Sequence, residues 1–151
     1  MDLRVSLLDD LDLTSALQAA AHQWTAGSDI RLDVQVAGER CQFPHDVEQN
    51  LLRIAQEAVT NSKKHSGAAN IWIRLQADPR KATLTVRDDG RGFDSGSVSI
   101  EDGHFGLLGM GERAERLGGQ FEIFSQLEKG TEIRATIPLV PEHTRGFPGS
   151  G

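Results

Sequence analysis

The chain has 151 residues, of which 38% are hydrophobic and 25% are charged, and this composition is typical of a single soluble globular domain. A formal net charge of -6 and a pI near 5.3 weigh against direct binding to nucleic acid. The sequence has no apolar run of roughly 18 residues and no secretory signal after Met1, and its single cysteine cannot form an internal disulfide, so we expect a cytoplasmic domain.

Hydrophobic periodicity predicts the elements of the first half of the chain. Residues 11–24 have the spacing of a helix, because apolar side chains recur every three or four positions. Residues 30–36 alternate between apolar and polar side chains, which is the pattern of a half-buried strand. Pro44 then opens a second helix that runs to about His65, where Ser-Gly ends it.

The second half of the chain is expected to be mainly strands. Alternating segments at 71–75 and 82–86 precede a long loop from Asp88 to Gly106 that is rich in glycine, serine and aspartate. A third helix is predicted over 108–117. The last two strands form a hairpin and span residues 121–125 and 131–137.

This order of elements predicts an α+β fold. The strands outnumber those that parallel crossovers would need, and strands adjacent in sequence must pair antiparallel. We therefore expect a two-layer α/β sandwich with a mixed, mostly antiparallel sheet and the helices on one face.

Three polar side chains recur on the second predicted helix: Glu57, Asn61 and Lys64. Spacings of four and three residues place them on one stripe of an α-helix. Asn61 can offer an oxygen to Mg²⁺, Lys64 can meet a phosphate as a point charge, and Glu57 can orient a water or accept its proton. A solvated helix face with ordinary polar pairs is the alternative interpretation of the same residues.

A second cluster, Asp88 to Gly92, directly follows a predicted strand. The Asp88 carboxylate can accept a hydrogen bond from an exocyclic amine, which favours adenine over guanine. Gly90 and Gly92 leave room for a base to approach the backbone. The alternative interpretation is an Asp-Gly turn without a binding function, which is common after a strand.

A third cluster of glycines opens the third helix, where backbone amides and the helix dipole favour an anion such as a polyphosphate. It comprises Gly106, Gly109, Met110 and Gly111. It is neither a P-loop, since no Gly-Lys-Ser/Thr follows, nor a dinucleotide fingerprint, since no first βαβ unit precedes it. A flexible hinge would explain it equally, just as a hairpin turn would explain Gly130-Thr131.

The four clusters in this order resemble the four ATP-binding boxes of the superfamily that joins gyrase, the large heat-shock chaperone, histidine kinases and mismatch-repair ATPases. The similarity is closest to sensor histidine kinases of the nitrate-sensor and desaturase-regulator type, and it covers Leu3 to Leu139. Residues 56–65 resemble the asparagine box, residues 88–93 and 104–113 the two glycine boxes, and residues 130–133 the last box.

The resemblance implies a role for each predicted site residue. Asp88 would hold the adenine amine, Thr131 would lie behind the adenine, Asn61 would hold Mg²⁺ and Lys64 would contact the nucleotide. Glu57 would assist phosphoryl transfer, and the loop from Asp94 to Phe105 would be the ATP lid. The residues that would shape the pocket and lid are Gly90, Gly92, Gly106, Gly109, Met110 and Gly111.

By the same resemblance, the chain would bind ATP with Mg²⁺ and transfer the γ-phosphoryl group to a histidine on separate dimerisation helices, for relay to a response regulator. Residues 1–11 look like a linker from those helices, residues 12–140 would be the catalytic domain, and residues 141–151 are expected to be a disordered tail. The parent protein would be a homodimer, and a membrane anchor is compatible with it.

Two other functions fit the boxes. An anti-sigma-type regulator would phosphorylate serine and bind a transcription factor, and the linker-like residues 1–11 argue against it. A degenerate module would sense ATP without catalysis, and the intact Glu57, Asn61 and Asp88 argue against that. None of the five histidines has the context of a phosphate acceptor.

Overall fold

The computed structural model describes residues 13–38, 43–92 and 105–139. The predicted linker over residues 1–11 and the predicted tail over residues 141–151 lie outside this part of the chain, and so does the predicted lid except for its last residue, Phe105. Within the described ranges, no helix is both long enough and apolar enough to cross a membrane.

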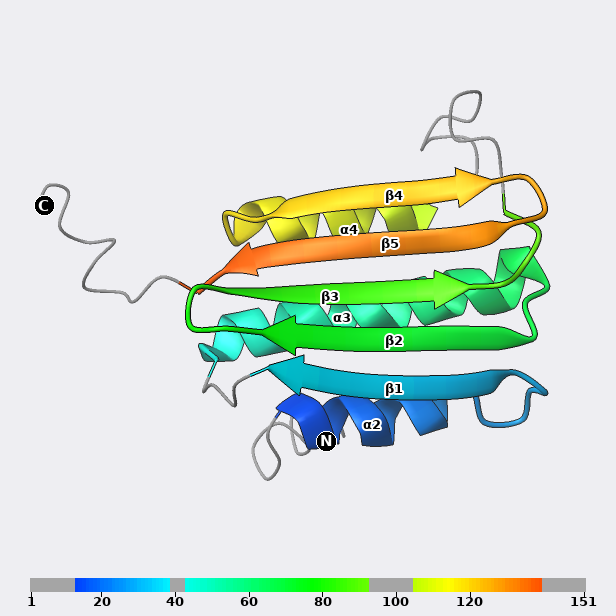
Figure 1. Ribbon diagram of the computed structural model, residues 1–151, viewed down its shortest axis with the longest axis horizontal. Coiled ribbons are helices and arrows are strands. Elements are labelled where there is room, and N and C mark those ends of the chain that lie inside the picture. The colour runs from blue at the N-terminus through cyan, green and yellow to red at the C-terminus, as the bar shows by residue number, and fades with distance from the viewer. Residues whose placement is uncertain (1–12, 39–42, 93–104, 140–151) are drawn as a thin grey trace, which may run out of the picture.

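The described chain forms one mixed sheet covered on one face by helices (Figure 1). In chain order the elements are α2 (Leu13–Trp24), β1 (Arg31–Gly38), α3 (His45–Asn61), the π-helical turn η1 (Ser62–Ser66), β2 (Asn70–Ala77), β3 (Lys81–Asp88), α4 (Phe105–Arg116), β4 (Gln120–Gln126) and β5 (Gly130–Pro138). The strand order is β1-β2-β3-β5-β4, with β1 and β2 parallel and the other neighbours antiparallel. The predicted α+β sandwich is confirmed.

The core lies between the helices and the sheet. Alternate residues of β2, such as Ile71 and Ile73, turn inward and are at most 1% exposed, while Leu51 and Ile54 of α3 meet them from the other layer. Each such side chain contributes about 1.5–3 kcal/mol when it is fully buried. This packing fixes the rotation of α3 about its axis and leaves Glu57 at the margin of the core, only half-buried.

Most element boundaries differ from the predicted ones by a few residues, and two of these differences concern the predicted clusters. β3 continues to Asp88, because Asp88 pairs with Ile71 of β2 and with Thr131 of β5, so the sheet extends past the last apolar residue of the strand. α4 begins at Phe105, inside the predicted loop.

The second predicted helix is α-helical only as far as Asn61. The π turn η1 follows directly and is capped by Gly67. The φ of Gly67 is 67°, in the left-handed region that favours glycine. A π turn is wider than an α turn, so Lys64 does not continue the α-helical stripe of Glu57 and Asn61. The prediction that the three side chains share one α-helical stripe is therefore wrong for Lys64.

Candidate functional site

Four segments distant in sequence meet at the edge of the sheet where β3 ends. They are the last turn of α3, the end of β3 with the residues after it, the start of β5 and the first half of α4 (Figure 1). All four of the predicted clusters are therefore on neighbouring elements.

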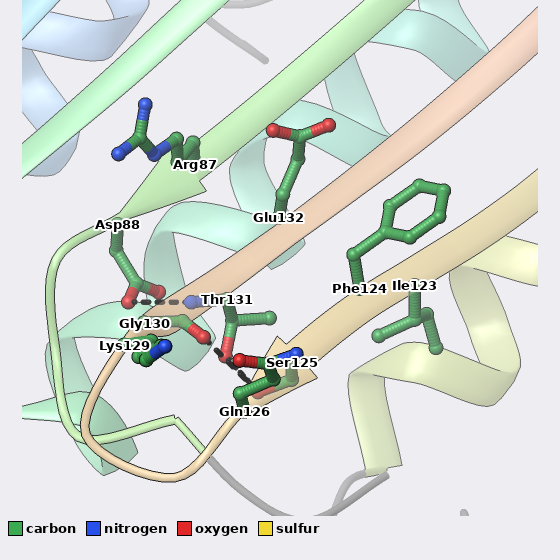
Figure 2. A pocket seen from close by; sticks show the side chains of 10 residues that line it. All are labelled: Arg87, Asp88, Ile123, Phe124, Ser125, Gln126, Lys129, Gly130, Thr131 and Glu132. Atoms are coloured by element: carbon green, nitrogen blue, oxygen red, sulfur yellow. Dashed lines mark hydrogen bonds between the residues drawn. The ribbon is translucent and has the colours of Figure 1, made fainter.

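Asp88 is the buried carboxylate of this edge, with only 5% of its surface exposed. Its Oδ2 accepts a hydrogen bond from the Ser62 hydroxyl at 2.6 Å. Its Oδ1 accepts the backbone N–H groups of Gly90 at 2.9 Å and Thr131 at 3.3 Å, and Figure 2 shows the contact with Thr131. A carboxylate has about four acceptor positions, and these three donors from the described residues occupy three of them.

Asp89, the next residue, has a structural function that the sequence did not suggest. It accepts the backbone N–H groups of Ala69 and Asn70 at 3.0 and 2.9 Å and the Asn70 side-chain amide at 2.8 Å. The side-chain hydrogen bond from Asn70, followed by the backbone ones, holds the pKa of Asp89 below its ordinary value. Asp89 thereby connects the end of β3 to the start of β2. In the sequence, an asparagine at the start of a strand is the feature that could have indicated this contact.

Two glycines let the loop after β3 lie against the β4–β5 hairpin. Gly92 has a φ of 62°, and a Cβ built on it would lie 2.0 Å from the carbonyl oxygen of Gln126. Gly130 has a φ of 86°, and its Cβ would lie 2.1 Å from the carbonyl oxygen of Asp88. Because both contacts involve backbone, no side chain can be accommodated at either position without moving the chain.

Thr131 lies beside Asp88 on β5, and its hydroxyl is 2.8 Å from that of Ser125 on β4. A cavity of about 410 Å³ opens at this point and is lined by Asp88, Gly130 and Thr131 among others (Figure 2). No residue of α3 lines it. The cavity therefore does not include Glu57 or Asn61 of α3. A second hollow, of about 710 Å³, lies over outward-facing strand residues such as Trp72 and Arg74 and includes none of the predicted site residues.

Glu57 is held by a residue that the sequence analysis did not single out. Its Oε1 is 3.3 Å from Nε of Arg113 on α4, and both side chains are 26% exposed. Its Oε2 lies over Gly109, where a Cβ would be 3.2 Å away. The predicted catalytic carboxylate is thus fixed between α3 and α4.

Asn61 is half-buried at the end of α3, and no hydrogen bond joins its side-chain amide to another residue of the described ranges. Lys64 is exposed on η1, one residue beyond Lys63, whose Nζ donates to the carbonyl oxygen of Trp24 at 2.6 Å. Within the described ranges, no group of three acidic, histidine or cysteine side chains is placed to hold a metal ion.

The remaining glycine-box residues lie on α4. Met110 is fully buried in the hydrophobic core, so only its backbone could contact a nucleotide. Gly111 is half-buried, and a Cβ there would make an ordinary contact of 3.5 Å with Phe121. Gly106 lies in the first turn of the helix.

Residues 46–141 match the family of histidine kinase-, DNA gyrase B- and HSP90-like ATPases. This match covers most of the chain and includes all four clusters. Members of this family bind ATP, and so does this domain.

The similar curated proteins are sensor kinases. The chain is 36% identical over 141 residues to the signal transduction histidine-protein kinase/phosphatase DegS of Brevibacillus brevis, covering 93% of this chain and 36% of that protein. It is 35% identical over 142 residues to the sensor histidine kinase MctS of Rhizobium johnstonii, covering 91% of this chain and 30% of that protein. The chain thus spans about a third of the length of these relatives.

Solved structures show the same fold. The blue-light activated histidine kinase of Erythrobacter litoralis EL346 superposes with a TM-score of 0.69 at 20% identity, over 91% of this chain and 45% of that one. The ATP-binding domain of PrrB from Mycobacterium tuberculosis gives 0.64 at 19% identity, over 86% and 93%. Because of the family match and of the relatives that are 35–36% identical, the chain belongs to the histidine kinase-, DNA gyrase B- and HSP90-like ATPases and is an ATP-binding catalytic domain of the sensor histidine kinase type.

Proposed function

We propose that this domain binds ATP with Mg²⁺ and transfers the γ-phosphoryl group to a histidine on the dimerisation helices of a homodimeric sensor kinase. The observation that supports this most is the buried Asp88 carboxylate, which lines a cavity and has one acceptor position beyond those used by its three donors in the described chain. That position suits an exocyclic amine such as that of adenine. Thr131 and Gly92 would then border the base.

In this proposal the polar end of α3 serves the phosphates. Asn61 would give its oxygen to Mg²⁺, which neutralises phosphate charge when bound, and Lys64 would add a positive charge from η1. The glycines of α4, from Gly106 to Gly111, would offer backbone amides near the positive end of the helix. Glu57 would orient the acceptor histidine or take its proton.

The phosphoryl group would then pass to an aspartate of a response regulator. We place the catalytic domain at residues 12–140 in the cytoplasm, with residues 1–11 as the linker from the dimerisation helices. A parent anchored in the membrane is compatible with this arrangement, since the domain needs only tethering to its acceptor.

Labelling with γ-³²P-ATP tests the proposal. The chain alone should bind ATP and remain unlabelled, because none of its histidines has an acceptor context and transfer is sensitive to placement. Adding the dimerisation helices of the full-length sensor kinase should give label on those helices that is labile in acid and stable in alkali. Asn61→Ala is the matched loss-of-function control. Acid-stable label on a serine of a partner would contradict the proposal and favour the anti-sigma type.

A further inference from the structure

The carboxylate of Glu57 contacts two residues of α4, Gly109 and Arg113. Gly109 and Arg113 are four residues apart and therefore lie on the same side of that helix. Gly109 has no side chain, and Oε2 of Glu57 lies only 3.2 Å from where a Cβ of this residue would be. Arg113 donates a hydrogen bond from Nε to Oε1 at 3.3 Å. We call this pair, Gly109 and Arg113, the Glu57 socket.

The socket restricts a side chain that is otherwise free to rotate. A glutamate at the margin of a core has three rotatable bonds, and ordering them costs conformational entropy. The ion pair is only 26% exposed on both sides, which makes it less screened than a surface pair. The guanidinium also balances the negative charge of Glu57 close to the proposed triphosphate.

Arg113 could instead serve only the end of its helix, since basic residues near a helix C-terminus interact favourably with the dipole. Arg116 tests this alternative within the same helix. It also lies in the last turn of α4, but it is exposed and makes no ion pair within the described part of the chain. The contact with Glu57 therefore distinguishes Arg113 from its neighbour.

We propose that Arg113 is a positioning residue for phosphoryl transfer, which acts by holding Glu57 in the socket. This inference rests on the proposed function, because it assigns the reaction to Glu57. It also gives Gly109 a second purpose, as the surface on which the carboxylate lies.

The test compares Arg113→Ala and Arg113→Lys with Arg116→Ala, using the chain together with the dimerisation helices. Arg113→Ala should lower the transfer rate at saturating ATP by about tenfold or more, while the KM for ATP changes by less than about twofold, because misplaced groups slow chemistry more than binding. Arg113→Lys should recover much of the rate, since it restores the charge without the planar fork. Arg116→Ala should transfer at the normal rate.

A second readout needs neither ATP nor activity. The side-chain carboxyl ¹³C resonance of Glu57 should move in Arg113→Ala and stay in place in Arg116→Ala. If the Glu57 resonance does not move in Arg113→Ala, then Arg113 does not hold Glu57 and the proposal is wrong. Normal transfer by both the original chain and Arg113→Ala would also overturn it, whereas failure of the original chain to transfer would contradict the proposed function itself.

Discussion

The hydroxyl of Ser62 donates a hydrogen bond of 2.6 Å to Oδ2 of Asp88, and this buried contact joins the end of α3 to the end of β3. The two residues are 26 positions apart in sequence. Through this bond, the helix that carries Glu57 and Asn61 is fixed relative to the carboxylate proposed to recognise adenine.

Ser62→Ala should lower the free energy of unfolding by about 1.5–3 kcal/mol, since it removes a buried hydrogen bond to a carboxylate. Urea unfolding followed by circular dichroism measures the change. Ser28→Ala is the control: its hydroxyl donates to the carbonyl oxygen of Thr25 in a part-buried turn, and its loss should cost no more than about 1 kcal/mol. Equal losses would contradict a special role for the contact with Asp88.

Asp88→Asn should abolish ATP binding and leave the fold intact. The amide oxygen can still accept the N–H groups of Gly90 and Thr131, but the amide nitrogen would replace an acceptor at the position proposed for the adenine amine. Two donors would then face each other, at a cost of about 1–3 kcal/mol or more. Calorimetric titration with ATP checks this, and undiminished affinity in a folded variant would place the adenine elsewhere.

Asn61→Ala should weaken binding of ATP in the presence of Mg²⁺ far more than in its absence, because its amide oxygen is proposed to hold the cation. Paired titrations in magnesium and in a chelator measure the two losses. If both affinities fall by the same factor, the proposed metal contact is wrong.

Gly130→Ala should destabilise the domain by more than about 3 kcal/mol, because a Cβ would lie 2.1 Å from the carbonyl oxygen of Asp88 and the strand would have to move. Gly27 has a similar φ, 82°, but nothing lies within 4 Å of its Cβ. Gly27→Ala should therefore cost only the backbone strain, about 1 kcal/mol. Similar unfolding midpoints for the two variants would show that the close approach at Gly130 is unimportant.

Asp89→Asn should destabilise the domain at pH 7, and this destabilisation should shrink as the pH falls below the unfolded value of 3.8. Hydrogen bonds hold the pKa of Asp89 below its ordinary value when the chain is folded, so its carboxylate stabilises the fold above the unfolded value of about 3.8. That stabilisation is lost as the pH falls through the folded pKa. Urea midpoints of both proteins at several pH values should therefore converge in acid, and a constant difference would contradict the assignment.

The sequence predicted the sandwich and most of its elements because the apolar alternation of the strands and the periodicity of the helices are strong local signals. The resemblance to the ATP-binding boxes also predicted that Asn61, Asp88 and Thr131 belong to one site. Asp88 and Thr131 do line one cavity, whereas the contribution of Asn61 stays a prediction. The sequence did not predict the pairing of Glu57 with Arg113, which are 56 residues apart, or the attachment of Asp89 to Asn70. These contacts depend on how α3, α4 and the strands pack, and no local pattern encodes that.

The π turn at Ser62–Ser66 was missed for a similar reason. Polar residues with good helix propensity continue the pattern of α3, so sequence spacing favoured an unbroken α-helix to His65. The difference matters for Lys64, whose direction depends on the width of that turn.

The strand order has a consequence for how the protein is made. β5 is synthesised after the other four described strands, yet it lies inside the sheet between β3 and β4 and supplies the Thr131 amide to Asp88. A chain emerging from a ribosome therefore exposes the edges of β3 and β4 until Pro138 has been released. During that interval the proposed adenine site lacks Gly130 and Thr131, so ATP should stabilise only a domain in which β5 has paired.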